Sequence, residues 1–260
     1  MGQSGKYFNV TVKPTLPVAS LIQSNKTDLP FSAGDVLADW TEFNVPKAGV
    51  KLCSITLLVR GENGAAQTSR DIQVLFAKSD TDGTAPATLG DENGAVSQTT
   101  TWQNNVIAHQ LLDLTTMSTR LTNMTVATTG ASTIDSLTPG NVNVVLQGEP
   151  LSDKGGAAKL YVGLVGGASN TWDFATGVLA NGAVSDGAAT DITVDGVDAR
   201  LVFSVGDVIH IHDSDTAVGT IKSIPDATSI ILKSTNGVAI ANNDEIVNAS
   251  PITLILSLER

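Results

Sequence analysis

Hydrophobic and polar residues alternate with a period of two along much of this 260-residue chain. Such alternation places apolar side chains on one face of an extended strand and polar side chains on the other. Gly, Pro, Asn or Asp residues bound the alternating segments, as expected at strand ends. The pattern predicts six longer strands, at residues 7–13, 50–60, 71–78, 141–147, 159–165 and 252–258.

One further segment, residues 102–114, is the only fair helix candidate, but its caps are poor, and the pattern does not decide its conformation. No long amphipathic helix is present to cover a parallel sheet, which argues against an α/β fold. Aromatic residues make up only 4% of the chain, so Val, Ile, Leu and Ala must build the core. The sequence therefore predicts an all-β fold whose main part is an antiparallel, jelly-roll-like β-sandwich.

The strand pattern changes after residue 166. Residues 167–189 are rich in Gly, Ala and Ser, which predicts a connection made of linker or loose loops. Residues 190–249 contain short strand candidates separated by turn residues, at 191–194, 199–203, 208–212, 219–224, 229–233 and 245–247. Strands this short and closely spaced suit a small closed β-barrel, which leaves no exposed edge.

The C-terminal segment, residues 250–260, contains a longer and more apolar strand than the short ones before it. Four apolar residues at every second position, from Ile252 to Leu258, share one face of this strand. We expect it to return to the sandwich. Residues 1–166 then form the β-sandwich, and residues 190–249 form a small β-barrel inserted between two sandwich strands.

Two short segments resemble each other: Phe31-Ser-Ala-Gly-Asp-Val-Leu37 and Phe203-Ser-Val-Gly-Asp-Val-Ile209. Glycine permits a positive φ, and an Asp side chain can accept hydrogen bonds from backbone N–H groups where a turn leads into a strand. We interpret the similarity as convergent turn chemistry.

The formal net charge is −11, and the fifteen Lys and Arg residues are dispersed from Lys6 to Arg260 without a run. A nucleic-acid-binding protein needs clustered cations to displace counterions from phosphates. An anionic membrane surface likewise attracts polybasic segments. We therefore expect neither nucleic acid nor a membrane as a partner.

Cys53 is the only cysteine, so no disulfide can form within the chain. It lies in the apolar run 51–59, which predicts a small core residue. The first residues lack the apolar stretch of a signal peptide, and no segment is long and apolar enough to span a bilayer. These features predict synthesis in a cytoplasm.

His210 and His212 are the sharpest metal-ligand candidates, because residues i and i+2 of a strand point to the same face. Asp213 and Asp215 lie nearby, and His109 is the only other histidine. A zinc site needs a third ligand from a distant segment, and the spacing matches no known ligand motif. The competing interpretation places both imidazoles on the solvent face of a barrel strand. We favour it and expect neither a bound metal nor a cofactor.

Residues 80–83, Asp-Thr-Asp-Gly, are similar to the start of a calcium loop. The twelfth position of such a loop requires a bidentate Glu, but here Asp91 occupies it and Glu92 follows one residue later. The fifth position holds Thr84, a weak ligand. An ordinary acidic turn explains the segment better.

The sequence contains no recognisable catalytic constellation. It has no Gly-x-Ser-x-Gly elbow, no histidine near Cys53, and no Gly-rich loop followed by Lys-Ser/Thr. Trp40, Trp102 and Trp172 allow a sugar-stacking platform, although each is better explained as an anchor of a core or of a subunit contact. We therefore expect a structural or binding protein and not an enzyme.

The C-terminal part contains Phe203-Ser-Val-Gly-Asp-Val-Ile, Val218-Gly-Thr-Ile-Lys-Ser-Ile, Thr228-Ser-Ile-Ile-Leu, Asn243-Asp-Glu-Ile and Ala249-Ser-Pro-Ile-Thr-Leu. The N-terminal part contains Gly5-Lys-Tyr-Phe-Asn-Val-Thr-Val, Asp39-Trp-Thr-Glu-Phe-Asn-Val-Pro-Lys47 and Lys51-Leu-Cys-Ser-Ile-Thr. Together these segments resemble structural proteins of tailed bacteriophages of the marine cyanophage type. The inserted barrel also resembles small barrels of the Src-homology-3 type, a fold with no fixed function.

The phage resemblance implies a virion protein, made in the host cytoplasm, that decorates or cements the outer surface of the capsid. Its partner is then the major capsid protein or another virion protein. Capsid positions with local three-fold symmetry favour a homo-oligomer, most plausibly a trimer, because matched symmetry lets every subunit make the same contact. The alternative function is a carbohydrate- or receptor-binding module of a virion fibre or surface appendage.

Overall fold

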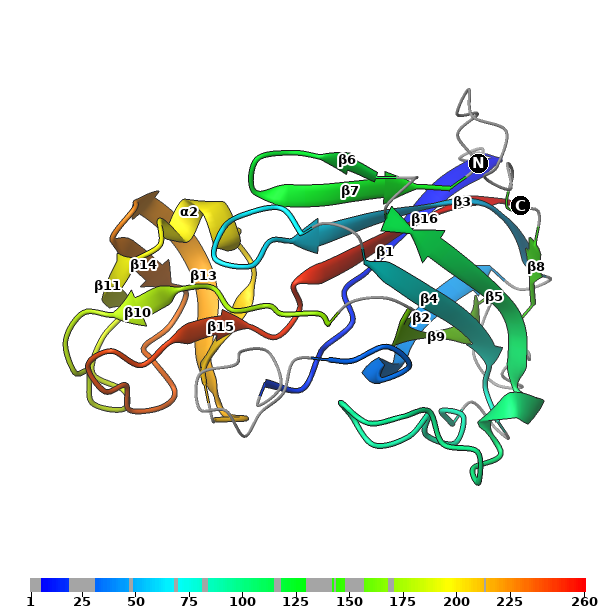
Figure 1. Ribbon diagram of the computed structural model, residues 1–260, viewed down its shortest axis with the longest axis horizontal. Helices are drawn as coiled ribbons and strands as arrows, with labels where there is room; N and C mark the ends of the chain where they lie inside the picture. Colours follow the sequence, from blue (N-terminus) through cyan, green and yellow to red (C-terminus); the bar gives the residue numbers. More distant parts are fainter. Residues whose placement is uncertain are drawn as a thin grey trace.

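The computed structural model describes residues 6–18, 31–46, 49–67, 70–80, 84–114, 118–129, 142, 144–147, 157–167, 171–212 and 214–260. The strands of these residues form three antiparallel sheets. Two of the sheets face each other and make a first lobe, and the third makes a smaller second lobe at one end of it (Figure 1). The fold is therefore all-β, as predicted.

The first lobe is a sandwich with a defined strand order. One sheet contains β1 (Tyr7–Val12), β16 (Ile252–Glu259), β3 (Val50–Arg60), β7 (Met124–Thr128) and β6 (Ser118–Arg120) in that order, and β8 (Val144–Leu146) pairs with the start of β3. The opposing sheet contains β2 (Val36–Pro46), β9 (Ala157–Gly166), β4 (Asp71–Lys78) and β5 (Val106–Asp113). The chain passes back and forth between the two sheets. The resulting order of neighbouring strands in each sheet is that of a jelly roll. The predicted jelly-roll-like sandwich is confirmed.

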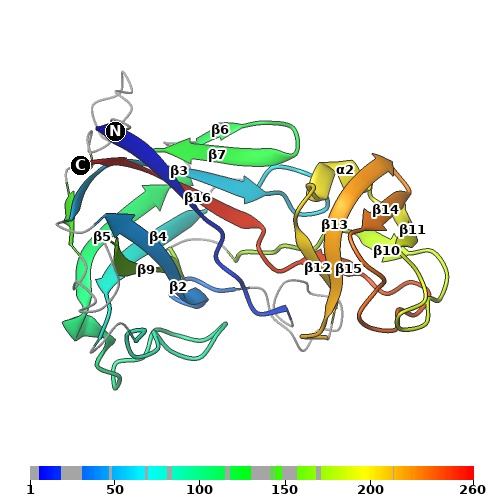
Figure 2. The same ribbon diagram turned by 180° about the vertical axis from the view of Figure 1, so that it is seen from behind.

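The C-terminal strand β16 lies between β1 and β3 inside the first sheet, next to its edge strand β1 (Figure 2). Leu254 pairs with Val12 of β1 on one side and with Leu57 of β3 on the other. The inward residues of β16, at every second position from Ile252 to Leu258, are at most 1% exposed. They share one core with inward residues of the opposing sheet, among them Val74, Phe76, Leu160 and Val162.

Cys53 is not the core residue that the sequence predicts. In the pairing of β16 with β3, Ser257 faces Ser54 and Leu258 faces Leu52, so Cys53 is the extra residue of a β-bulge. Its side chain is half-buried. The bulge lets Leu52 and Ile55, three residues apart, both point inward, which a regular strand does not allow.

The structure decides one segment that the pattern left open and shortens one predicted strand. Residues 102–114, the helix candidate, form one turn of 3₁₀-helix, η3 (Trp102–Asn104), followed by β5. The pairing of β5 with β4, a contact between separate segments, decides this conformation. Of the predicted strand 141–147, residues 144–146 form β8, whereas residues 141 and 143 lie outside the described residues.

The sequence pattern also misses β2, β6 and β7. The register of β2 against β9 shifts twice, between Val36 and Ala38 and between Ala38 and Thr41. These irregularities destroy the strict alternation by which a strand is recognised. The strands β6 and β7 are short and form a hairpin, and only β7 pairs with β3, so these pairings define the two strands better than their composition does.

The second lobe is a single six-stranded sheet. It contains β10 (Val178–Ala180), β11 (Asp191–Gly196), β14 (Ser229–Leu232), β13 (Ala217–Asp226), β12 (Val208–Ile211) and β15 (Ile246–Asn248) in that order. Residues 178–180, which the sequence assigns to the connection, thus belong to this sheet. The sheet encloses its own core, which includes Val178, Ile192, Ile209, Ile221 and Ile230.

The sheet of the second lobe does not close into the predicted barrel. In the described residues its two outer strands, β10 and β15, do not pair in a ladder. The segments beside them meet through an isolated bridge between Leu179 and Glu245 and through two hydrogen bonds of 2.8 Å, from the Ala180 N–H to the Asp244 carbonyl and from the Asn243 N–H to the Ala180 carbonyl. The side chain of Glu245 completes the contact, because it accepts hydrogen bonds from the backbone N–H groups of Thr176 and Gly177.

Residues 199–203 are not the strand that the pattern predicts. Residues Ala199–Val202 form a single helical turn, α2. Asp198 caps it by accepting a hydrogen bond from the Arg200 N–H, and such a cap stabilises a helix start over an extended chain. Among the described residues, no helix is long and apolar enough to cross a membrane.

An inward leucine of β16 tests the assigned faces of the central strand. Leu256→Ala removes a fully buried side chain and leaves a cavity, so the free energy of unfolding should fall by about 2–5 kcal/mol. Ser257→Ala, on the outward face of the same strand, should change it by less than about 0.5 kcal/mol. Urea titration followed by circular dichroism measures both, and equal losses in the two variants would contradict the fold.

Candidate functional site

The three histidines of the chain do not gather at one site. His210 lies in β12 and His212 directly after it, and both are half-buried, whereas His109 is exposed on β5 in the other lobe. Within the described ranges, no group of three His, Cys, Asp or Glu side chains is placed to hold a metal ion. Asp213 lies outside those ranges, and the expectation of no bound metal stays a prediction.

The acidic segment 80–92 shows turn chemistry where it is described. The backbone N–H of Asp80 donates to the carbonyl of Thr84, and the N–H of Gly94 donates to the carbonyl of Asp91, each at 3.0 Å. Asp82 lies outside the described residues. These two hydrogen bonds close separate local turns.

The three tryptophans anchor two different cores. Trp172 is fully buried and stacks on Phe174 with ring centroids 5.8 Å apart, whereas Trp40 and Trp102 pack with Leu89 on the outer face of the second sheet. Each indole N–H donates to a backbone carbonyl, with distances of 2.8 to 3.2 Å. The three rings therefore do not form one sugar-stacking platform.

The two similar segments fold into the same turn. Asp35 accepts a hydrogen bond from the Ser32 N–H at 2.7 Å, and Asp207 accepts one from the Ser204 N–H at 2.9 Å. The glycines between them have φ values of +87° and +93°, in the left-handed region that glycine tolerates. The predicted turn chemistry is thus present at both positions, before β2 and before β12.

Asp207 accepts further hydrogen bonds beyond the one that closes the turn, because it lies where the two lobes meet. Its side chain is only 3% exposed. Beyond the turn bond, its carboxylate accepts from the Asn248 amide at 2.9 Å and from the Lys13 ammonium at 3.0 Å. Lys13 follows β1 of the first lobe and Asn248 ends β15 of the second, so one buried carboxylate connects both lobes. Buried charges are tolerated when they are paired and hydrogen-bonded in this way.

A small pocket of about 40 Å³ opens beside this carboxylate. Its lining combines the outward face of the first sheet with the junction residues: Lys13, Leu58, Arg60, Met124, Asp207, Asn248, Ser250, Pro251 and Thr253. Arg60 also reaches the second lobe, through a hydrogen bond to the Ser204 hydroxyl. The lining thus combines two cations, Lys13 and Arg60, with the carboxylate of Asp207.

Sequence reasoning did not find this junction pocket, because its residues come from five separate parts of the chain. Only one local signal pointed to it, the repeated Phe-Ser-x-Gly-Asp motif that ends in Asp207. The motif predicts a turn but not the partners of its carboxylate. Those partners, Lys13 and Asn248, are set by the way β1 and β15 meet at the junction.

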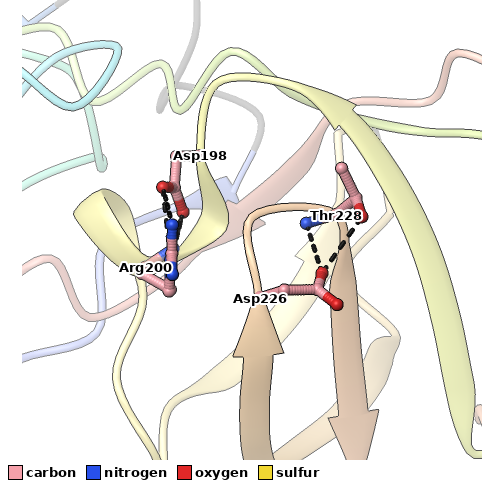
Figure 3. A network of polar contacts seen from close by, with 4 residues as sticks. All are labelled: Asp198, Arg200, Asp226 and Thr228. Carbon is pink, nitrogen blue, oxygen red and sulfur yellow. Dashed lines mark hydrogen bonds and ion pairs between the residues drawn. The ribbon is translucent and has the colours of Figure 1, made fainter.

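A second polar cluster lies on the surface of the second lobe (Figure 3). Arg200 donates to Asp198 through Nε at 2.9 Å and through Nη2 at 2.6 Å. Asp226 accepts from the N–H and the hydroxyl of Thr228. These hydrogen bonds lower the pKa of Asp198 and of Asp226. All of them are local cap and turn contacts, so the cluster is structural.

Replacing Asp207 tests the connection between the lobes, with Asp35 as a matched control. Asp207→Asn removes the negative charge to which Lys13 and Asn248 donate hydrogen bonds, and it leaves those donors facing an amide. The free energy of unfolding should therefore fall by about 1.5–3 kcal/mol. Asp35→Asn changes the same turn without those partners and should cost clearly less. Chemical denaturation compares the two variants, and a larger loss for Asp35→Asn would refute the assigned role.

The carboxyl group of Asp71 tests the electrostatics of the second sheet. Asp71 starts β4 directly opposite Asp113 of β5, and burial together with that carboxylate raises its pKa. Because its pKa is raised, the Asp71 carboxyl holds its proton more tightly in the folded protein than in the unfolded chain. The protonated carboxyl is therefore compatible with folding at acidic pH, and this advantage is lost as pH rises through the folded pKa. Asp71→Asn should therefore be more stable than the wild type at pH 7, with the difference shrinking towards pH 4.

Thermal unfolding between pH 4 and pH 7 measures that difference. Asp186→Asn, at an exposed aspartate in a turn of the second lobe, is the control and should follow the wild type. A wild type that is more stable than Asp71→Asn at pH 7 would show that the carboxyl pair is not unfavourable.

Comparison of the sequence with known families and curated proteins does not identify a relative. No known protein family matches the chain. No curated protein matches its sequence either. The assignment of a function therefore depends on the strand order, the surfaces and the pocket described above.

Proposed function

We propose that this chain is a non-enzymatic structural protein of a virus particle, which decorates or cements the outer capsid surface through protein–protein contacts. The observation that carries the proposal is the jelly-roll strand order of the first lobe. Viral capsid domains use this architecture, and so do lectins. The support is an analogy of fold, and it agrees with the resemblance of both chain ends to tailed-phage structural proteins.

The outward face of the first sheet suits contact with another protein. Its central part carries uncharged side chains at facing positions of four strands, which are short and polar except for one isoleucine: Asn9, Thr11, Ser54, Thr56, Thr128, Ile255 and Ser257. Thr56 and Thr128 share a hydrogen bond of 3.2 Å across β3 and β7. Short side chains lose little conformational entropy when a partner orders them, so such a face can dock at low cost.

Open strand edges favour an oligomer. Within the described residues, no strand pairs with the outer edge of β5, which has eight residues and exposes 43% of Leu111. An uncovered edge of this length invites pairing with another chain unless something shields it. A neighbouring subunit provides that shield, and several simultaneous contacts strengthen attachment to a lattice.

A purified sample tests the oligomer and intact particles test the location. Light scattering on the purified protein should give the mass of a trimer, three times the 26.8 kDa mass of one chain. Antibodies raised against the protein should label the surface of intact particles of the virus that encodes it. A monodisperse monomer that is absent from particles would overturn the proposal, and specific binding on a glycan array would favour the carbohydrate-binding alternative.

A matched pair of variants tests whether the outward face of the first sheet makes the contact with the capsid. Thr11→Lys places a long charged side chain on the outward face of the first sheet, where Thr11 is exposed, and should abolish attachment to particles. Thr193→Lys makes the same change at an exposed strand position of the second lobe and should attach like the wild type. Attachment of the Thr11 variant at wild-type level would show that another surface makes the contact.

A further inference from the structure

The junction pocket concentrates positive charge in an acidic protein. The chain has a net charge of −11 and only fifteen Lys and Arg residues, yet two of them, Lys13 and Arg60, line this one small space. Dispersed cations on a protein surface carry no information about a ligand. Two cations that converge on one pocket beside a single carboxylate, Asp207, leave a net positive charge there, which attracts an anion.

Hydrogen-bond donors exceed acceptors in the pocket. Both oxygens of Asp207 are engaged, one by Lys13 and the other by Ser204 and Asn248. Lys13 has three N–H donors and Arg60 has five, and the hydrogen bonds to Asp207 and Ser204 use only part of them. The hydroxyl groups of Ser250 and Thr253 complete the polar part of the lining.

The size and walls of the pocket restrict the ligand. A volume of about 40 Å³ admits a few water molecules or one small polar group, and it excludes a sugar ring or a nucleotide. Leu58, Met124 and Pro251 form apolar walls, which strengthen the attraction between a cation and an anion held there.

We infer that the junction pocket binds one small oxyanion, a carboxylate or a tetrahedral phosphate or sulfate, between the Arg60 guanidinium and the Lys13 ammonium. The planar guanidinium can hold two oxygens of such a group at once, and the ammonium supplies a point charge. A bound anion contacts the first sheet and the junction residues together, so it stabilises the lobes against each other. This inference does not depend on a role in a capsid.

Isothermal titration calorimetry on the intact chain tests the inference. Sodium phosphate, sodium sulfate and sodium acetate are titrated separately at constant ionic strength set with sodium chloride. We expect one anion per chain. Arg60→Met should weaken binding by about tenfold or more, because a charge-assisted pair is lost, and Arg60→Lys should retain part of it. Lys51→Met, at the far end of the same sheet face beside Glu259, is the control and should bind like the wild type.

The three anions distinguish the source of the ligand. Tighter binding of phosphate or sulfate identifies a free inorganic ion, whereas tighter binding of acetate identifies a carboxylate, such as the side chain or C-terminus of a partner chain. The absence of saturable binding of all three anions to the wild type overturns the inference, whatever the variants do. Equal weakening in the Arg60→Met and Lys51→Met variants also overturns it, because that result reports a general effect of charge. Circular dichroism confirms that each variant is folded.

Discussion

The pairing of β16 between β1 and β3 is the interaction on which the rest of the structure depends. It places the strand β16 inside the first sheet between β1 and β3, so the core of the jelly roll is incomplete until β1 and β16 meet. Strand pairings between segments this distant in sequence require a long loop to close first. The second lobe eases that closure, because Glu245 and the bridge to Leu179 hold its two ends side by side.

The junction shows how one local motif acquires two roles. Asp35 and Asp207 close the same turn with the same backbone hydrogen bond. Only Asp207 lies where strands of both lobes converge, and there its carboxylate gains Lys13 and Asn248 as further partners. A turn residue thereby becomes the buried contact between two lobes, and the donors left over around it form the pocket with Arg60.

The surfaces of the two sheets of the first lobe differ in a way that bears on function. The outer face of the second sheet is covered by the segment that carries Trp102 and Leu89, which forms a small core of its own. The outward face of the first sheet presents short polar side chains and stays partly exposed. Among the described residues, the first lobe thus has one covered and one partly exposed sheet face, and the pocket lies at the end of the exposed face beside the second lobe.

The sequence by itself determined the all-β class and the strands β1, β3, β4, β9 and β16, because their regular alternation is a local property that burial on one face requires. It also determined the turn before β12, since Gly206 and Asp207 encode its geometry. Only the tertiary structure decided the bulge at Cys53, the strand conformation of β5, and the partners of Asp207. Each of these depends on which segment lies alongside, and a pairing between distant segments leaves no periodic signal in either one.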